Sequence, residues 1–100
     1  MYMRIGWGKL RPGQWAKYAA AYEQTIPVSE GMPGFIGRWL GKDADDPDSG
    51  YTVSLWETKE DLDRWDELSR NTLLPAMEPY FTGEFRISRC EVAISTTPQK

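Results

Sequence analysis

The sequence has no histidine and a single cysteine, Cys90. Without an imidazole, the chain has no histidine base for a serine or cysteine nucleophile, no histidine metal ligand and no proximal histidine for haem iron. A lone cysteine can form neither an internal disulfide nor a thiolate zinc cluster within one chain. These absences argue against the usual hydrolase and metalloenzyme classes, and we predict no metal site.

Long apolar runs and an excess of positive charge are also missing. No segment approaches the roughly 18 consecutive apolar residues of a membrane helix, and residues 1–11 lack the apolar core of a signal peptide. The 12 Lys and Arg residues and the 15 Asp and Glu residues give a formal net charge of -3. Such a charge offers no general attraction to nucleic acids or to anionic membranes. We therefore expect a cytoplasmic protein that binds neither nucleic acid nor membranes.

The length of 100 residues predicts one domain over residues 1–100, with residues 96–100 as a frayed tail. A chain of this size buries only about two thirds of the surface that its unfolded form exposes, so a partner often completes the core. Aromatic residues make up 13% of the chain and supply large side chains for such a core.

The central segment has the pattern of a β-hairpin. Aromatic and branched residues predict strands over residues 35–40 and 51–56, and the residues between them, 41–50, predict an exposed turn. The four aspartates of this turn lack the spacing of a calcium loop. Pro47 takes a ligand position, and Ser54 stands where the closing glutamate belongs.

Two segments have helical patterns. Thr58 occupies the position of an N-cap, and an apolar stripe follows it. Pro12 suits the first turn of an earlier helix, which should end or kink near Ile26 because Pro27 disfavours the α conformation in the residue before it. The stripe of the earlier helix consists of Trp15, Tyr18, Ala19, Tyr22 and Ile26, and that of the later helix of Leu62, Trp65 and Leu68.

The first and last segments predict two more strands. Residues 1–10 alternate as a strand does, and Gly6 and Gly8 share one of its faces. The gap that they leave is open to a ligand or to a tryptophan from a helix, and close packing favours the tryptophan. Residues 71–80 predict a broken helix or a short extra turn because they contain two prolines, and residues 81–95 predict a strand that bends or carries a bulge near Gly83.

The predicted order is β-α-β-β-α-β, the ferredoxin-like α+β arrangement in which a four-stranded antiparallel sheet carries two helices on one face. The strands place large apolar side chains on both faces, which two helices cannot both cover. A second copy of the chain packed sheet to sheet is the simplest cover, so we predict a homodimer through the sheet faces.

Three successive motifs, MPGFIGRWL, DADDPDSG and YTVSLWETKEDLDRW, resemble the antibiotic biosynthesis monooxygenase family. The resemblance implies a dimeric α+β barrel and a cofactor-independent monooxygenase that acts on a small aromatic or polyketide-like molecule between helices and sheet. The alternative is a non-catalytic dimeric module of the same fold that binds a small molecule or another protein. This chain departs from the haem-degrading branch of the family at two positions. Pro75 stands where the haem-ligating histidine would fall, and the asparagine of the branch's first strand would fall at or near Gly6.

Trp65 matches the tryptophan of the family's second helix, and Asn71 is the only asparagine in the chain. The resemblance makes these two residues candidates for a catalytic cleft, in which the amide of Asn71 could orient a substrate oxygen. The alternative is that Trp65 packs in the core and that Asn71 closes the C-terminus of the helix.

Four further residues are candidates for binding substrate: Tyr22, Arg38, Tyr51 and Arg86. A guanidinium beside an apolar cleft could stabilise an enolate or phenolate, and tyrosines offer phenol groups. The alternative places both arginines at the rim of the dimer interface, paired with Glu57, Glu84 or Glu91.

Overall fold

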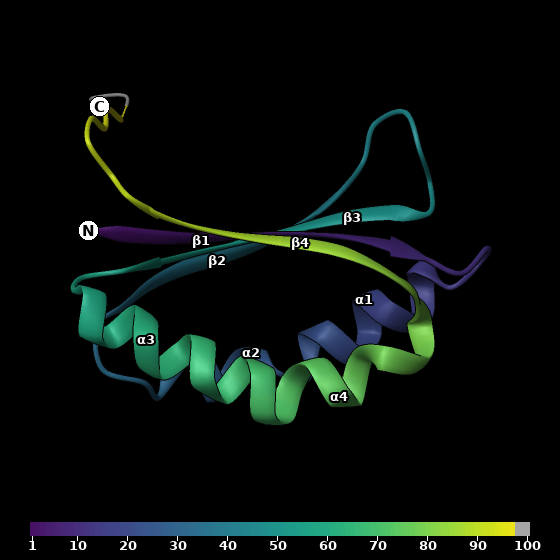
Figure 1. Ribbon diagram of the computed structural model, residues 1–100, viewed down its shortest axis with the longest axis horizontal. Helices are drawn as coiled ribbons and strands as arrows, with labels where there is room; N and C mark the ends of the chain where they lie inside the picture. The colour runs from purple at the N-terminus through teal and green to yellow at the C-terminus, as the bar shows by residue number, and fades with distance from the viewer. Residues whose placement is uncertain (98–100) are drawn as a thin grey trace.

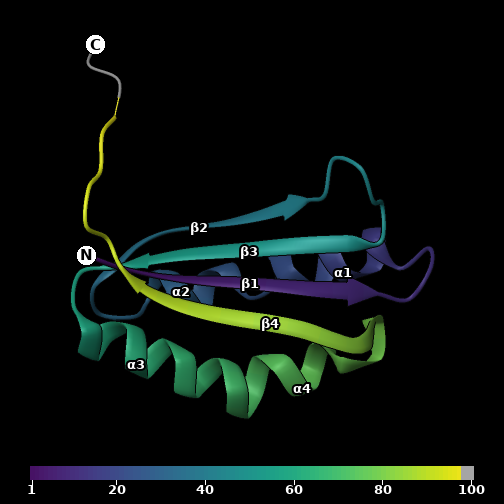
Figure 2. The ribbon, with the colours of Figure 1, turned by 45° about the horizontal axis from the view of Figure 1, so that its top comes forward.

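The structure is a computed structural model that describes residues 1–97. Its core element is a four-stranded sheet in the order β2-β3-β1-β4, with every neighbouring pair antiparallel (Figure 2). The strands are β1 (Tyr2–Leu10), β2 (Phe35–Lys42), β3 (Ser49–Trp56) and β4 (Phe81–Glu91). The predicted ferredoxin-like α+β fold is confirmed.

All helices lie on one face of the sheet (Figure 1). Thr58 opens the longest helix as its predicted N-cap: Thr58 Oγ1 accepts a hydrogen bond from the Asp61 backbone N–H at 3.1 Å. The Asp61 carboxylate also accepts one from the Thr58 N–H at 3.2 Å, which completes a capping box that was not predicted. The α-helices are α1 (Trp15–Glu23), α2 (Ile26–Glu30), α3 (Lys59–Leu68) and α4 (Leu74–Met77).

The first helical segment kinks at Gln24 and Thr25, close to the predicted position, and then continues as α2. Pro27 lies in the first turn of α2 and does not end the segment. A proline is tolerated there because its missing N–H would have no partner within the helix. Thr25 supports the kink by donating a hydrogen bond from Oγ1 to the Tyr22 carbonyl oxygen at 2.6 Å.

The predicted broken helix over residues 71–80 is a change of helical pitch. A π-helical turn, η1 (Ser69–Leu73), joins α3 to α4, and a 3-10 turn, η2 (Glu78–Tyr80), follows α4. Pro75 lies in the first turn of α4, where a proline can start a helix after the wider turn.

The last strand contains the predicted bulge. Gly83 has φ of +103°, and the pairing with β1 shifts between Gly8 and Leu10. The strand ends at Glu91 instead of Ser95, because β1, the strand beside it, begins at Tyr2. The predicted frayed tail is only partly described: residues 96 and 97 have no regular secondary structure, and residues 98–100 lie outside the described residues.

Buried apolar side chains form two clusters between helices and sheet. One contains Leu10, Tyr18 and Met77, and the other contains Trp56, Leu62 and Trp65. Members of both clusters line one cavity, so the apolar core of this layer is divided by open space.

The opposite face of the sheet has no helix among residues 1–97 (Figure 1). Trp39 and Tyr51 are 54% and 40% exposed there. We call this the outer face, and strand alternation places on it Met3, Ile5, Trp7, Trp39, Tyr51, Val53, Leu55 and Arg86. Among the described residues, the helices are too short and too polar to span a membrane.

Candidate functional site

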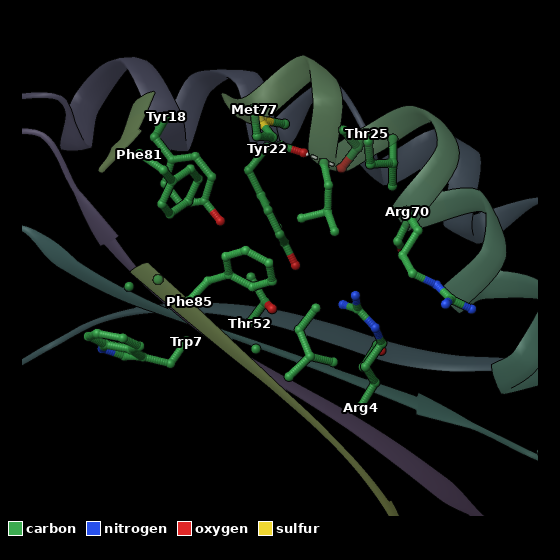
Figure 3. Close-up of a pocket in the computed structure, with 18 of the residues that line it drawn as sticks. Arg4, Trp7, Tyr18, Tyr22, Thr25, Thr52, Arg70, Met77, Phe81 and Phe85 are labelled. Atoms are coloured by element: carbon green, nitrogen blue, oxygen red, sulfur yellow. Dashed lines mark hydrogen bonds between the residues drawn. The ribbon is translucent and has the colours of Figure 1, made fainter. Parts of the chain in front are cut away.

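A cavity of about 400 Å³ lies between the helices and the sheet (Figure 3). This volume falls within the range of small-molecule sites in proteins. Side chains from α1, α3, α4 and all four strands contribute to its walls, which are mostly apolar. Its large apolar and aromatic lining residues include Tyr18, Tyr22, Trp65, Met77, Phe81, Phe85 and Ile87.

Glycines give the cavity its depth on the side of the sheet. Gly6, Gly8 and Gly50 all line it. A Cβ at Gly8 would lie 2.5 Å from the Phe81 ring, and one at Gly6 would lie 2.7 Å from Thr52 Oγ1. The two glycines of β1 thus line the cavity, and the side chains that lie against them are those of Phe81 and Thr52 and not a helix tryptophan.

The guanidinium of Arg38 lies between two aromatic rings, 4.4 Å from the centre of Tyr22 and 4.6 Å from the centre of Trp65. It donates hydrogen bonds to Thr25 O at 3.2 Å, Thr25 Oγ1 at 2.9 Å and Ser29 Oγ at 3.0 Å. Cation-π contacts and these bonds together fix the guanidinium against the junction of α1 and α2. Arg38 thus has hydroxyl and carbonyl partners, and not the carboxylate that the alternative interpretation required.

Trp65 both packs and lines the cavity. It is only 3% exposed, and its ring stacks on Trp56 with 5.3 Å between ring centres and 29° between planes. It also belongs to the cavity wall. Most of the Trp65 side chain therefore packs in the core, and the remaining part of it forms cavity wall.

Arg4 and Asp66 form a buried ion pair beside the cavity. Arg4 Nε lies 2.9 Å from Asp66 Oδ1, and both side chains are 8% exposed. The other oxygen, Oδ2, is 3.1 Å from Arg70 Nη2 and 3.9 Å from Arg89 Nη1. A buried charge requires such partners, because an isolated one is costly to remove from water.

Two tyrosine hydroxyls point into the cavity (Figure 3). Burial, and secondarily the neighbouring Tyr22, raises the pKa of Tyr18 to about 12, while Arg38 opposes the shift. The Tyr18 phenol therefore keeps its proton at neutral pH and can act as a hydrogen-bond donor.

The structure brings together three of the six predicted site residues, Tyr22, Arg38 and Trp65. It does not bring Asn71 to the cavity. Asn71 is exposed in η1, six residues beyond Trp65, which corresponds to roughly one and two-thirds helical turns and a different side of the helix. It does not close a helix either, since the chain continues into α4.

Tyr51 and Arg86 lie on the outer face. Tyr51 pairs with Trp7 across the sheet, so strand alternation turns it away from the helices, and Thr52 lines the cavity in its place. Arg86 also pairs with Trp7, and its guanidinium lies 5.2 Å from the centre of the Trp7 ring. Arg86 takes part in the cavity lining, but its charge lies on the side of Trp7, which points away from the cavity (Figure 3).

Sequence reasoning missed Arg4, Tyr18 and Phe85 as lining residues. Arg4 gave a signal, because it shares a strand face with Gly6 and Gly8, the residues that marked the gap. Phe85 gave none, since its orientation depends on the bulge at Gly83 that sets the register of β4.

The cavity can hold a small, mostly apolar molecule and offers it a few polar groups, an arrangement typical of binding sites and active sites. Within residues 1–97, no three His, Cys, Asp or Glu side chains come close enough to form a metal site.

A sequence profile of the antibiotic biosynthesis monooxygenase family matches residues 1–70. Among curated proteins, none matches the sequence. Solved structures are similar in fold. An antibiotic biosynthesis monooxygenase shares 15% identity over 94% of this chain and 100% of its own, with a TM-score of 0.78.

Two other similar structures have more specific descriptions. SnoaB from Streptomyces nogalater, a cofactor-independent oxygenase, shares 17% identity over 98% of this chain and 97% of its own, with a TM-score of 0.77. A variant of MhuD with two manganese protoporphyrin IX molecules bound per active site shares 18% identity over 98% of this chain and 100% of its own, with a TM-score of 0.80. At these identities the likeness establishes the fold alone. The profile match over residues 1–70 establishes that the chain belongs to the antibiotic biosynthesis monooxygenase family.

Proposed function

We propose that this protein is a cofactor-independent monooxygenase that oxidises a small aromatic or polyketide-like molecule in the cavity between helices and sheet. The observation that carries the proposal is the cavity of about 400 Å³, with mostly apolar walls and a few convergent polar groups. Family membership and the likeness in fold to SnoaB, a cofactor-independent oxygenase, support it.

The chemistry suits a site without a metal. A substrate with an acidic CH₂ group next to a carbonyl, such as an anthrone, loses a proton to form an electron-rich enolate, which can reduce dioxygen directly. Converting this CH₂ group to a carbonyl removes four electrons, and one dioxygen accepts them: one oxygen atom enters the product and the other leaves as water. No external reductant is needed, so the protein has to bind the substrate, exclude bulk water and stabilise the anion.

Haem is the competing ligand suggested by the fold, since MhuD binds a manganese porphyrin. The residues of this chain do not fit the same use. The sequence has no histidine to ligate iron, and Pro75 lines the cavity at the position that the resemblance gives to that ligand. The proposal therefore assigns the cavity to an organic substrate.

A binding module without catalysis is the second candidate. A module whose cavity is filled by its own Trp and Tyr side chains is disfavoured, because open space remains beside Tyr18, Tyr22 and Trp65. A module that binds an aromatic molecule without oxidising it would have the same cavity. Oxygen-electrode measurements with anthrone distinguish the two: the monooxygenase consumes dioxygen in a saturable reaction, and the binding module leaves the spontaneous rate unchanged.

The proposal includes a cytoplasmic homodimer that pairs through the outer face. The exposed Trp39 and Tyr51 and their apolar neighbours support it, because a patch of this kind is uncommon on a monomer. A second copy would bury the same face on both subunits.

A further inference from the structure

Two hydrogen-bond donors in the cavity wall have no protein partner within residues 1–97. They are Nη2 of Arg4 and Oη of Tyr22, and both atoms are buried. The two residues are only 7% and 8% exposed. Buried polar groups nearly always have a partner, so donors of this kind beside an open cavity indicate that a ligand supplies the acceptor.

The two donors point into the same space. Arg4 rises from β1 on the side of the sheet, and Tyr22 descends from α1 on the side of the helices (Figure 3). The walls near them are mostly apolar, with Met77 and Phe85 among the labelled side chains, while Thr25 and Thr52 add hydroxyl groups. A ligand that satisfies both donors would therefore place a polar oxygen between them and an apolar body in the rest of the cavity.

The charge of the lining favours an anion. Arginines outnumber carboxylates among the described lining residues, although the whole chain is acidic: Arg4, Arg38 and Arg70 line the cavity, against Glu78 alone, and Arg86 is not counted because its charge lies over Trp7 on the outer face. Asp66 offsets part of the Arg4 charge, but it lies near Arg70 and Arg89 as well. In a low-dielectric cavity, the net positive charge of this group attracts a ligand oxyanion more strongly than it would in water.

Arg4 is the arginine best placed to meet that anion. Arg38 already donates hydrogen bonds to Thr25 and Ser29, and the guanidinium of Arg86 lies over Trp7. Arg4 uses Nε for Asp66 and keeps Nη2 unpartnered.

We propose that the cavity selects aromatic molecules that carry an ionised oxygen, either a carboxylate or a phenolate or enolate. Arg4 Nη2 and Tyr22 Oη bind the oxyanion, and the aromatic and aliphatic walls bind the ring system. This inference rests on the proposed function and names the substrate class of the same site.

The test compares matched probes by isothermal titration calorimetry on the wild-type protein at pH 7. One pair is naphthalene-2-carboxylate and naphthalene-2-carboxamide, which differ in charge and hardly in shape. The other is the dinitronaphtholate anion and its methyl ether. We expect at least one anion to bind about tenfold more tightly than its neutral partner, the effect of one charge-assisted hydrogen bond. Preference in only the first pair identifies a carboxylate site, and preference in only the second identifies a phenolate or enolate site. Equal affinities within both pairs overturn the inference.

Variants locate the effect. Arg4→Gln should abolish the preference for the anion, Arg4→Lys should retain part of it, and Tyr22→Phe should weaken anion binding while the ring remains in the wall. Arg64→Gln removes the same charge from α3 at a side chain that is 52% exposed and outside the cavity lining, so it should leave the preference unchanged. A preference that survives both Arg4→Gln and Tyr22→Phe overturns the assignment. Should Arg4→Gln fail to fold, the wild-type comparison and Tyr22→Phe still decide.

Measurements of binding and of turnover test this inference and the proposed function separately. Selective binding of an anion without oxidation of any aromatic substrate overturns the proposed function and leaves this inference standing. Oxidation of neutral and anionic aromatic substrates with equal kcat/KM, together with equal binding of the probe pairs, overturns the inference and leaves the monooxygenase proposal standing.

Discussion

Arg38 and Trp65 meet across the cavity wall, with the guanidinium carbon 4.6 Å from the centre of the indole ring. This contact joins β2 to α3, and the hydrogen bonds from Arg38 to Thr25 and Ser29 extend it to the junction of α1 and α2. One side chain thus connects the sheet to the helices on both sides of the cavity.

Arg38→Met should therefore destabilise the protein, by about 2–4 kcal/mol, because it removes charge-assisted hydrogen bonds and two cation-π contacts at once. Arg38→Lys should cost less but still lower stability, because a single ammonium group cannot reproduce the planar fork. Urea unfolding at pH 7 measures both, with Arg64→Met as a control at an exposed position. A stability of Arg38→Met within about 0.5 kcal/mol of the wild type contradicts the connecting role.

Trp65→Phe should change both stability and binding. The loss of the stack on Trp56 should cost about 1–2 kcal/mol, and the smaller ring should change the affinity for aromatic probes because it alters the cavity wall. Trp15→Phe is the matched control, since Trp15 packs over Gly50 and is not part of the lining. If Trp65→Phe loses stability and binds every probe as the wild type does, Trp65 is a packing residue only.

Val53→Arg should convert a dimer into a folded monomer. Val53 lies opposite both Ile5 and Trp39, in the middle of the outer face, where a partner subunit would bury an unpaired charge. Light scattering at micromolar concentration should give twice 11.5 kDa for the wild type and 11.5 kDa for the variant. Thr72→Arg, at an exposed position of η1, should remain dimeric. A wild-type mass of 11.5 kDa excludes the dimer.

Asp46 should make the free energy of unfolding depend on pH in the acid range. A hydrogen bond from Lys9, followed by bonds from the Asp48 N–H and the Ser49 hydroxyl, lowers the pKa of Asp46 from 3.8 to about 2. Because the folded pKa lies below the unfolded one, the stabilisation is fully present above about pH 4 and disappears as the pH falls toward 2. The stability difference between the wild type and Asp46→Asn, measured in urea, should shrink over this interval. A difference that stays constant down to pH 2 would show that the interaction does not stabilise the fold.

Much of the fold could be predicted from local patterns in the sequence. The N-cap at Thr58, the kink before Pro27 and the alternation in β1 each depend on neighbouring residues, and each is observed. The end of β4 could not be predicted in the same way, because it depends on where β1 begins, far away in the sequence.

The candidate site was harder to predict for the same reason. Tyr22 and Trp65 lie on apolar helical stripes, so their orientation toward the sheet followed from periodicity. The side of the sheet on which Tyr51 and Arg86 lie depends on the register between strands, and composition does not reveal it. The unpartnered donor of Arg4 could not be predicted either, because it depends on how Asp66 shares its two oxygens between Arg4 and Arg70 in the folded chain.

The most direct test of the proposed monooxygenase is the fate of dioxygen in the presence of anthrone. Purified protein, treated with a chelator, is incubated with anthrone under isotopically labelled dioxygen, and the product is analysed by mass spectrometry beside a sample without protein. The proposal predicts anthraquinone with one labelled oxygen atom, formed at a saturable rate above the spontaneous one and unaffected by the chelator. The proposal is contradicted if the rate with protein equals the rate without it. It is also contradicted if the chelator-treated protein accelerates the reaction only after a metal or haem is added.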